Sequence, residues 1–412
     1  MAVSDRGCAI GCLGKWPILR KTLFAVCLAR VYNERMYLDR TYRPRRRTRG
    51  LGRLWPLIFI ALLGVILYEE QPRWLIAQSP LPTPTPTRSA IFFQASAESA
   101  LRANNYEAAF RAYAEMSRLE PTNPDSFIAL SELHLMFQDT EQALQAAQRA
   151  VGVAPNDPDA LAARARALNW ENENDDAAID AFDALEIDPE HVRTLAVLSE
   201  IYTDIGNRDI AENYINQALA LDPTDILALR NRAYLLEQRG DYEAAVVAYE
   251  AAIAAAPHRF DLYIEFGRLL RVGLGNFDQA VEVYRAAVKV YEAPITLDAL
   301  GDGLYNNGDH LQAVRELRKA IELDPTFGLA QIHLGMALYA RRNYEDAATH
   351  LEIGLRLVGD DARVEQIYTA GLAYVYKEPR ECEKAIPWLQ KALELDTTSS
   401  PALDGMARCS QP

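Results

Sequence analysis

Residues able to carry out catalysis or to hold a metal are sparse and scattered along this chain. The six histidines lie in separate stretches, and none has a second histidine at the spacing of paired metal ligands. No nucleophile elbow, phosphate loop or dinucleotide fingerprint occurs. The lone pair Gly273 and Gly275 falls between two expected helices, which favours a turn over phosphate binding. The sequence therefore predicts no catalytic residue, no metal and no cofactor.

The strongest pattern is a period of 34 residues, which must describe the elements that position every other side chain. Alanine recurs on this period, with a slip of one residue around Ala280 and of a few before Ala385, at Ala109, Ala143, Ala177, Ala211, Ala245, Ala280, Ala313, Ala347 and Ala385. Proline recurs in phase at Pro121, Pro155, Pro189, Pro223, Pro257 and Pro325. A third position always holds Ala, Ser or Gly.

Each period has the hydrophobic spacing of two helices separated by a breaker. In residues 226–259, Leu229, Ala233 and Leu236 recur at helical intervals, Gly240 interrupts, and the pattern resumes until Pro257. The unit is therefore a helical hairpin. The small residues are expected where its two helices cross, because a large side chain there would hold them apart.

This arrangement resembles the tetratricopeptide repeat family, whose pattern places a small residue at position eight of the unit, Ala at twenty and Pro at thirty-two. The resemblance implies an all-α, right-handed superhelical solenoid of about nine hairpins over residues 89–399, with residues 400–412 forming a capping helix and tail. Unit six carries an extra residue within 272–276, so the regular superhelix is expected to be perturbed there.

Charge divides the chain into a basic end and an acidic body. The whole sequence has a net charge of −14, but residues 1–53 hold 13 Lys and Arg against 3 Asp and Glu. An acidic body argues against nucleic acid as the ligand of the repeats, because neutralising phosphates requires clustered cations. Residues 1–35 match no pattern; they are explained either by a start site assigned too early, with Met36 as the true start, or by an amphipathic cytoplasmic helix.

The apolar run 54–68 follows this basic segment and is interpreted as a transmembrane signal-anchor helix. Its 15 residues span only about 22 Å as a helix, so a cleaved signal peptide and a buried core helix are alternatives. The arginines from Arg43 to Arg53 favour a cytoplasmic N-terminus, which predicts a single-pass protein of the cell membrane with its repeats outside the cytoplasm. The Pro/Thr-rich linker 69–88 is expected to be an extended spacer.

The family resemblance also implies a protein-binding groove on the concave face, which the first helix of each unit lines. Carried over by position, the groove residues are Arg166, Asn169, Trp170, Arg230, Tyr234, Arg268, Arg271, Tyr305, Tyr339 and Tyr374. Aromatic residues with interspersed arginines are typical of interaction hot spots, although several of these aromatics are equally expected to pack between helices.

Two cysteines near the C-terminus fit a disulfide. Cys382 begins the second helix of unit nine and Cys409 lies near the end of the cap helix, and neighbouring helices of the stack run antiparallel. An extracytoplasmic location permits the bond, and two free thiols are the alternative. The sequence as a whole predicts a membrane-anchored scaffold that binds proteins or peptide segments without catalysis; the alternative is a recognition subunit for a separate enzyme, such as a glycosyltransferase or an envelope-assembly complex.

Overall fold

The computed structural model of this protein describes residues 55–69 and 89–411, which belong to two separate units, 1–85 and 86–412. In the first unit, α2 (Trp55–Glu69) is an apolar helix of 15 residues that coincides with the expected transmembrane segment 54–68. Among the helices of the described residues, none is both long enough and apolar enough to span a membrane. The expected basic segment 1–53, and the linker after Glu69, lie outside the described residues.

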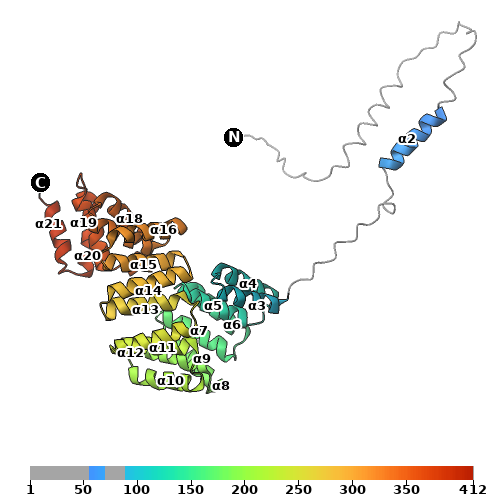
Figure 1. Ribbon diagram of the computed structural model, residues 1–412. Coiled ribbons are helices and arrows are strands. Elements are labelled where there is room, and N and C mark those ends of the chain that lie inside the picture. Colours follow the sequence, from blue (N-terminus) through green and yellow to red (C-terminus); the bar gives the residue numbers. More distant parts are fainter. Residues whose placement is uncertain (1–54, 70–88, 412) are drawn as a thin grey trace, which may run out of the picture. The chain divides into compact units, whose positions relative to one another are not determined.

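The second unit is built only from helices, stacked in chain order as nine hairpins and one last helix over the described residues 89–411 (Figure 1). The helices are α3 (Ala90–Arg102), α4 (Tyr106–Leu119), α5 (Asp125–Met136), α6 (Thr140–Val153), α7 (Pro158–Trp170), α8 (Asn174–Ile187), α9 (Val192–Asp204), α10 (Arg208–Leu221), α11 (Ile226–Arg239), α12 (Tyr242–Ala255), α13 (Phe260–Arg268), α14 (Phe277–Val290), α15 (Pro294–Asn306), α16 (His310–Leu323), α17 (Gly328–Ala340), α18 (Tyr344–Val358), α19 (Val364–Tyr376), α20 (Cys382–Leu395) and α21 (Ser400–Cys409). The prediction of an all-α solenoid of hairpins is confirmed.

In the first eight hairpins, two consecutive residues just before the second helix shape the turn. The first adopts a left-handed backbone, which Gly240 and Gly308 reach without steric penalty and which Gln138 and Arg342 adopt despite their side chains. The second is commonly Asn or Asp, whose side chain caps the next helix: the Asn105 Oδ1 accepts the amide hydrogen of Ala108 at 3.1 Å. This chemistry ends the first helix and begins the second.

The periodic alanines mark where the two helices of each hairpin cross. All nine have an exposed fraction of 0%. On the facing helix the small residue is equally constrained, since a Cβ added to Gly301 would lie 2.4 Å from the Leu317 Cγ. Close approach of the backbones therefore explains the period.

The extra residue of unit six is absorbed as a π-helical turn, η1 (Leu269–Gly273), which directly continues α13. A π-turn accommodates one inserted residue without ending the helix. The predicted perturbation at this unit is confirmed, and it shifts the side chains that follow Arg268 relative to the regular repeat.

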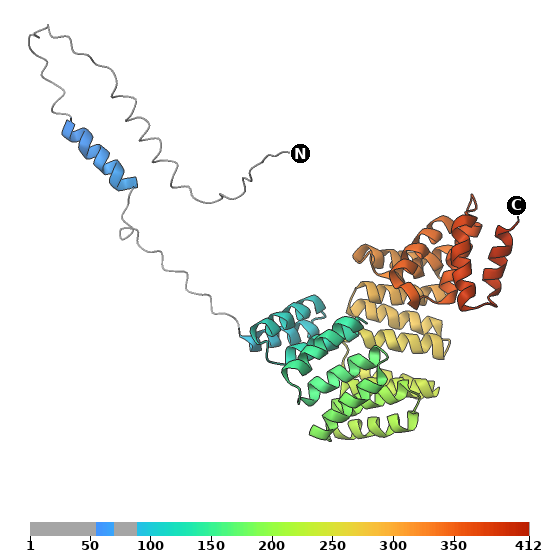
Figure 2. The ribbon, with the colours of Figure 1, turned by 180° about the vertical axis from the view of Figure 1, so that it is seen from behind.

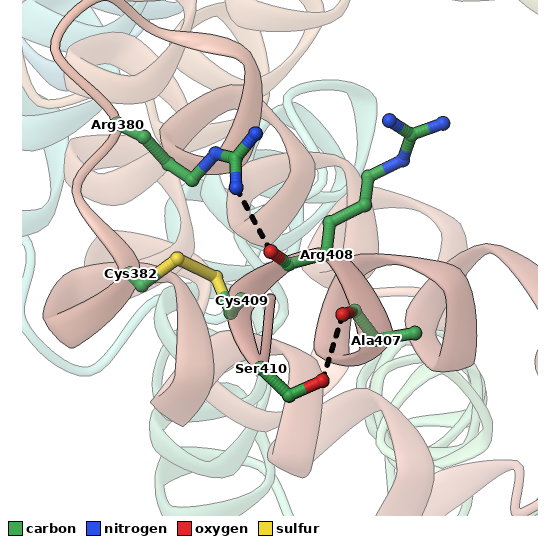
Figure 3. The surroundings of a disulfide bond; sticks show 6 residues. All are labelled: Arg380, Cys382, Ala407, Arg408, Cys409 and Ser410. Atoms are coloured by element: carbon green, nitrogen blue, oxygen red, sulfur yellow. Dashed lines mark hydrogen bonds between the residues drawn. A yellow bond between two sulfur atoms is a disulfide. The ribbon is translucent and has the colours of Figure 1, made fainter. Parts of the chain in front are cut away.

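The last helix, α21, packs against α19 and α20. Cys382 and Cys409 form a disulfide between α20 and α21, with Cα atoms 5.5 Å apart (Figure 3). Beside it, an Nη1 of Arg380 donates a hydrogen bond of 2.8 Å to the backbone carbonyl of Arg408. The cap is thus held by covalent and polar contacts as well as by apolar packing.

Candidate protein-binding surfaces

The first five of the expected groove residues lie within a buried network of charges. Glu200 of α9 has an exposed fraction of 2% and stands at the centre of this network. Its carboxylate accepts hydrogen bonds from the Arg166 Nε at 3.2 Å and the Trp170 Nε1 at 2.9 Å, and it also pairs with Arg230. Arg166 and Arg230 in turn reach Glu132, at 2.7 Å, and Glu265, at 2.8 Å. We call Glu132, Arg166, Glu200, Arg230 and Glu265 the ion-pair ladder.

The ladder keeps its charges because each is paired. Burial by itself would raise the pKa of Glu200, but the guanidinium groups of Arg230 and Arg166 lower it to about 2. The guanidinium carbons of Arg166 and Arg230 each lie over the Trp170 ring, 5.8 Å from its centroid. The side chains of Arg166, Trp170 and Arg230 are therefore already bonded to other residues of this chain.

Asn169 and Tyr234, the other two of these five groove residues, are also bonded within the chain. The Asn169 Nδ2 and the Tyr234 hydroxyl each donate a hydrogen bond of 2.6 Å to the carboxylate of Asp204. The structure thus brings together all five N-terminal groove residues, but around partners that the positional argument missed. The sequence did contain a signal for these ion pairs, because Glu132, Arg166 and Glu200 alternate in charge at the 34-residue interval.

The concave side next to the ladder is closed by a contact between the first hairpins and the sixth. Figure 1 and Figure 2 show α5 beside the ends of α13 and α14. The fully buried Tyr106 donates its hydroxyl hydrogen to the carbonyl of His258, and its ring packs edge-on against Phe260 at 5.1 Å. The rings of Phe137 and Tyr291 join this cluster. Residues 152 positions apart are therefore in contact.

Little space is left behind this closure. A cavity of about 20 Å³ lies between Arg166 and Trp170 on one side and Arg259, Asp261 and Glu265 on the other. That is about the room of one water molecule. A peptide does not fit there without opening the contact around Tyr106.

The other five expected groove residues lie beyond this closure, in units six to nine. Arg268 pairs with Glu237 at 2.7 Å, whereas Tyr305 and Tyr339 are half-buried on the first helices α15 and α17. Tyr374 is not a groove residue: its exposed fraction is 4%, and its hydroxyl donates to Glu352 of α18. Packing against the second helix of the preceding hairpin has drawn it into the core.

Two tyrosines that the positional argument missed, Tyr344 and Tyr376, extend this surface from Tyr339. The three rings are in contact, with centroids 5.4 to 6.4 Å apart. A cavity of about 60 Å³ lies in the same units, between α15, α17, the start of α19 and Arg271 of η1. It is lined by Arg271, Asp302, Tyr305, Asn306, His333, Met336, Arg363, Glu365 and Gln366. We call this the C-terminal cavity.

Family models of the tetratricopeptide repeat match residues 100–167, 199–259, 260–294 and 299–362, together more than half of the chain. Similar curated proteins include the protein CTR9 homolog of Arabidopsis thaliana, 28% identical over 51% of this chain and 20% of that protein, and the BBSome complex member BBS4 of Bos taurus, 25% identical over 55% and 43%. The chain thus spans less than half the length of either relative.

Among solved structures, the chain resembles the APC/C hetero-tetramer Cut9-Hcn1, with a TM-score of 0.56 and 20% identity, over 73% of this chain and 59% of that one. It also resembles the human IFIT1 dimer with PPP-AAAA, with a TM-score of 0.51 and 14% identity, over 77% and 82%. At these identities the likeness shows the fold alone.

Proposed function

Because this chain belongs to the tetratricopeptide repeat family, we propose that it is a scaffold that holds a segment of a partner protein on the concave face of units six to nine. Stacked hairpins of this kind form extended concave surfaces that suit protein segments. The scaffold has no chemistry of its own, and it acts by bringing its partner to a fixed place.

We choose units six to nine as the binding surface because the two halves of the solenoid differ in how their concave side chains are bonded. In the N-terminal half, the expected groove side chains are bonded to carboxylates of the chain, Glu200 and Asp204 among them, and Tyr106 closes the surface beside them. In the C-terminal half, a cavity and a set of half-buried tyrosines face the concave side, free of such a closure among the described residues. Half-buried tyrosines bury a large apolar area on binding at low entropic cost.

Alanine substitution of the groove tyrosines tests this proposal. Tyr305→Ala and Tyr339→Ala are each expected to weaken partner binding about tenfold, because each removes a central aromatic contact. The measurement is quantitative capture of cross-linked partners by the full chain from extracts of the cells that make it. Tyr214→Ala is the matched control, since Tyr214 is half-buried on a second helix, α10, and stacks only on Tyr202.

Thermal melting of each variant separates loss of binding from loss of fold. If folded Tyr305→Ala and Tyr339→Ala proteins both capture every partner at the level of the unchanged chain, the concave face of units six to nine is not the binding surface. If Tyr214→Ala alone loses partners, the convex face binds them instead.

We also propose that residues 54–68 attach the scaffold to the cell membrane, with the N-terminus in the cytoplasm and the repeats outside. The basic cluster before the apolar run supports this orientation. The disulfide between Cys382 and Cys409 supports an oxidising location for the repeats.

Thiol mapping in intact cells tests this orientation within one chain. With thiols blocked at lysis, Cys8, Cys12 and Cys27 are expected to be alkylated, because they lie on the reducing side of the membrane, whereas Cys382 and Cys409 are expected in a disulfide-linked peptide. Peptide mass mapping with and without reductant reads out both groups. Alkylation of Cys382 and Cys409 would place the repeats in the reducing compartment.

A further inference from the structure

The irregular turn of unit six exposes apolar side chains at the edge of the solenoid where the hairpin turns lie. Val272 of η1 is 64% exposed, and Leu274 and Phe277 follow it as further exposed apolar residues. Leu311, at the start of α16 in the next unit, is also 64% exposed. Single exposed apolar residues are ordinary on protein surfaces, but four at two successive turns form a patch of the kind that marks interaction sites.

An open groove of about 530 Å³ lies beside this patch, between the N-terminal half of α14 and the turn that joins α15 to α16. The buried side chain of Leu304 lines it. Asp278, which directly follows Phe277, and Asp309, two residues before Leu311, line it as well. A groove of this size has room for several side chains of a partner. We call it the turn groove.

The turn groove carries more negative than positive charge. Asp278, Glu282 and Asp309 line it with a single cation, Arg285. Arg285 and Glu282 pair at 2.6 Å, but their side chains are 43% and 69% exposed, so the pair contributes little to stability and can exchange for a partner's cation. The Asp278 Oδ1 accepts a hydrogen bond of 3.1 Å from the neutral amide of Asn307, which leaves its charge uncompensated.

The surroundings of the turn groove do not supply the missing positive charge. Tyr242 packs beside the end of η1, since a Cβ added to Gly273 would lie 3.0 Å from its ring. On either side of Tyr242, Asp241 and Glu243 are exposed and have no ion pair in the part of the chain that the structure describes. The arginines near these turns in the sequence each pair with another carboxylate: Arg239 with Glu212, Arg271 with Asp302 and Arg315 with Glu316.

These charges decide among the surfaces that could cover the apolar patch. Nucleic acid and anionic lipid both present phosphates, which the carboxylates of the turn groove would repel. The repeats of a second copy are acidic too, because the whole chain has a net charge of −14 although residues 1–53 are basic. The chemistry that matches is a segment of another protein in which Lys or Arg alternate with aliphatic residues.

We propose that the turn groove binds such a basic, partly aliphatic segment of a partner protein. Aliphatic side chains of the segment pack on Val272, Leu274 and Phe277, while its Lys or Arg side chains enter the groove and pair with Asp278 and Glu282. The apolar contacts supply affinity, and the charges supply selectivity for a basic partner. The π-turn η1 agrees with this role, because π-turns inside helices occur frequently at functional sites. The surface is separate from the concave tyrosines and adds a second binding face to the scaffold.

Subtractive selection from a displayed library of random dodecapeptides tests the inference. Peptides that bind the full-length Asp278→Lys chain are removed first, and those that remain are selected on the unchanged chain at pH 7 and low salt. The selected peptides are expected to combine Lys or Arg with aliphatic residues, and exchange of the basic residues for Gln is expected to weaken binding about tenfold. Asp175→Lys is the matched control and is expected to bind like the unchanged chain, because Asp175 is the exposed second residue of α8, as Asp278 is of α14, and does not line the groove.

The apolar part of the turn groove is tested with the same selected peptide. Val272→Ser is expected to weaken its binding about fivefold, because an apolar contact is lost. Ile205→Ser is the control, since Ile205 is an exposed apolar residue in the turn of unit four and is expected to have no effect. Binding is also expected to weaken as salt is raised, because exposed charges are screened.

The concave variants separate this inference from the proposed groove of units six to nine. Tyr305→Ala and Tyr339→Ala are expected to bind the selected peptide like the unchanged chain. Loss of binding in these two variants, with none in Val272→Ser, would place the peptide on the concave face and overturn the turn groove. The same follows if no peptide survives the subtraction, if the selected peptides lack basic residues, or if Asp278→Lys and Asp175→Lys lose binding equally.

Discussion

Replacing Glu200 by alanine is expected to lower the free energy of unfolding by about 3–5 kcal/mol. The substitution leaves Arg166 and Arg230 buried without the carboxylate that lies between them, and the exposed fractions of their side chains are only 5% and 9%. It also removes the acceptor of the Trp170 indole hydrogen. Arg166 keeps Glu132 and Arg230 keeps Glu265, but both lose the most deeply buried carboxylate of the ladder, so this change is expected to cost far more than the loss of an exposed ion pair.

Chemical denaturation at pH 7 measures this loss, and Glu212→Ala is the matched control. Glu212 pairs with Arg239 at 2.7 Å, but its side chain is 46% exposed, so its removal is expected to lower the free energy of unfolding by less than about 1 kcal/mol. Equal losses in the two variants would show that the ladder does not hold buried charges.

The low pKa of Glu200 also gives this pair of variants a pH signature. Because the folded state holds this pKa at about 2, below the ordinary 4.5, the carboxylate stabilises the fold above pH 4.5, and that contribution is lost as the pH falls from 4.5 to about 2. The Glu200→Ala protein is expected to lack this component of acid destabilisation, whereas Glu212→Ala retains it.

Adding one methyl group at Gly354 is expected to lower the free energy of unfolding by about 2–3 kcal/mol. Gly354 lies on α18 where it crosses α17, and its Cβ would stand 2.7 Å from the backbone nitrogen of Ile332 and 2.8 Å from the carbonyl oxygen of Gly328. Backbone atoms of a packed helix cannot rotate away, so the two helices must separate.

The same substitution at Gly152 is the control, and it is expected to act in the opposite direction. Gly152 lies in α6 with no atom within 4 Å of an added Cβ, so Gly152→Ala should stabilise the protein by about 0.5–1 kcal/mol through helix propensity. Denaturant midpoints of both variants are the measurement. A Gly354→Ala protein as stable as the unchanged chain would mean that α17 and α18 do not approach so closely.

Much of the fold was predictable because it depends on neighbours within one repeat. Ala143 and Gly301 are small because each faces the other helix of its own hairpin, and Asn105 caps the helix that it precedes. Such constraints recur every 34 residues and are therefore visible in the sequence. The extra residue before Asn276 was equally visible, and the π-turn is the local response to it.

The proposed binding surface was only partly visible in the sequence. Position in the repeat assigned Arg271 and Tyr305 to the groove, and both line the C-terminal cavity, but it assigned the same role to Arg166 and Arg230, which are buried in the ion-pair ladder. It also included Tyr374, which turns toward α18. Position tells which helix face a side chain occupies; it does not tell whether another part of the chain already covers that face.

By itself, the sequence determined the hairpin, its turns, its crossing points and the number of times it is repeated, because each of these depends on residues close together in the chain. Only the tertiary structure decided which concave surface stays open. The contact of Tyr106 with Phe260 and His258 joins hairpins far apart in sequence, and it forms because small rotations between successive hairpins accumulate until the first units meet the sixth. No local pattern records that sum, which covers the concave surface beside the ion-pair ladder and leaves only a cavity of about 20 Å³ there.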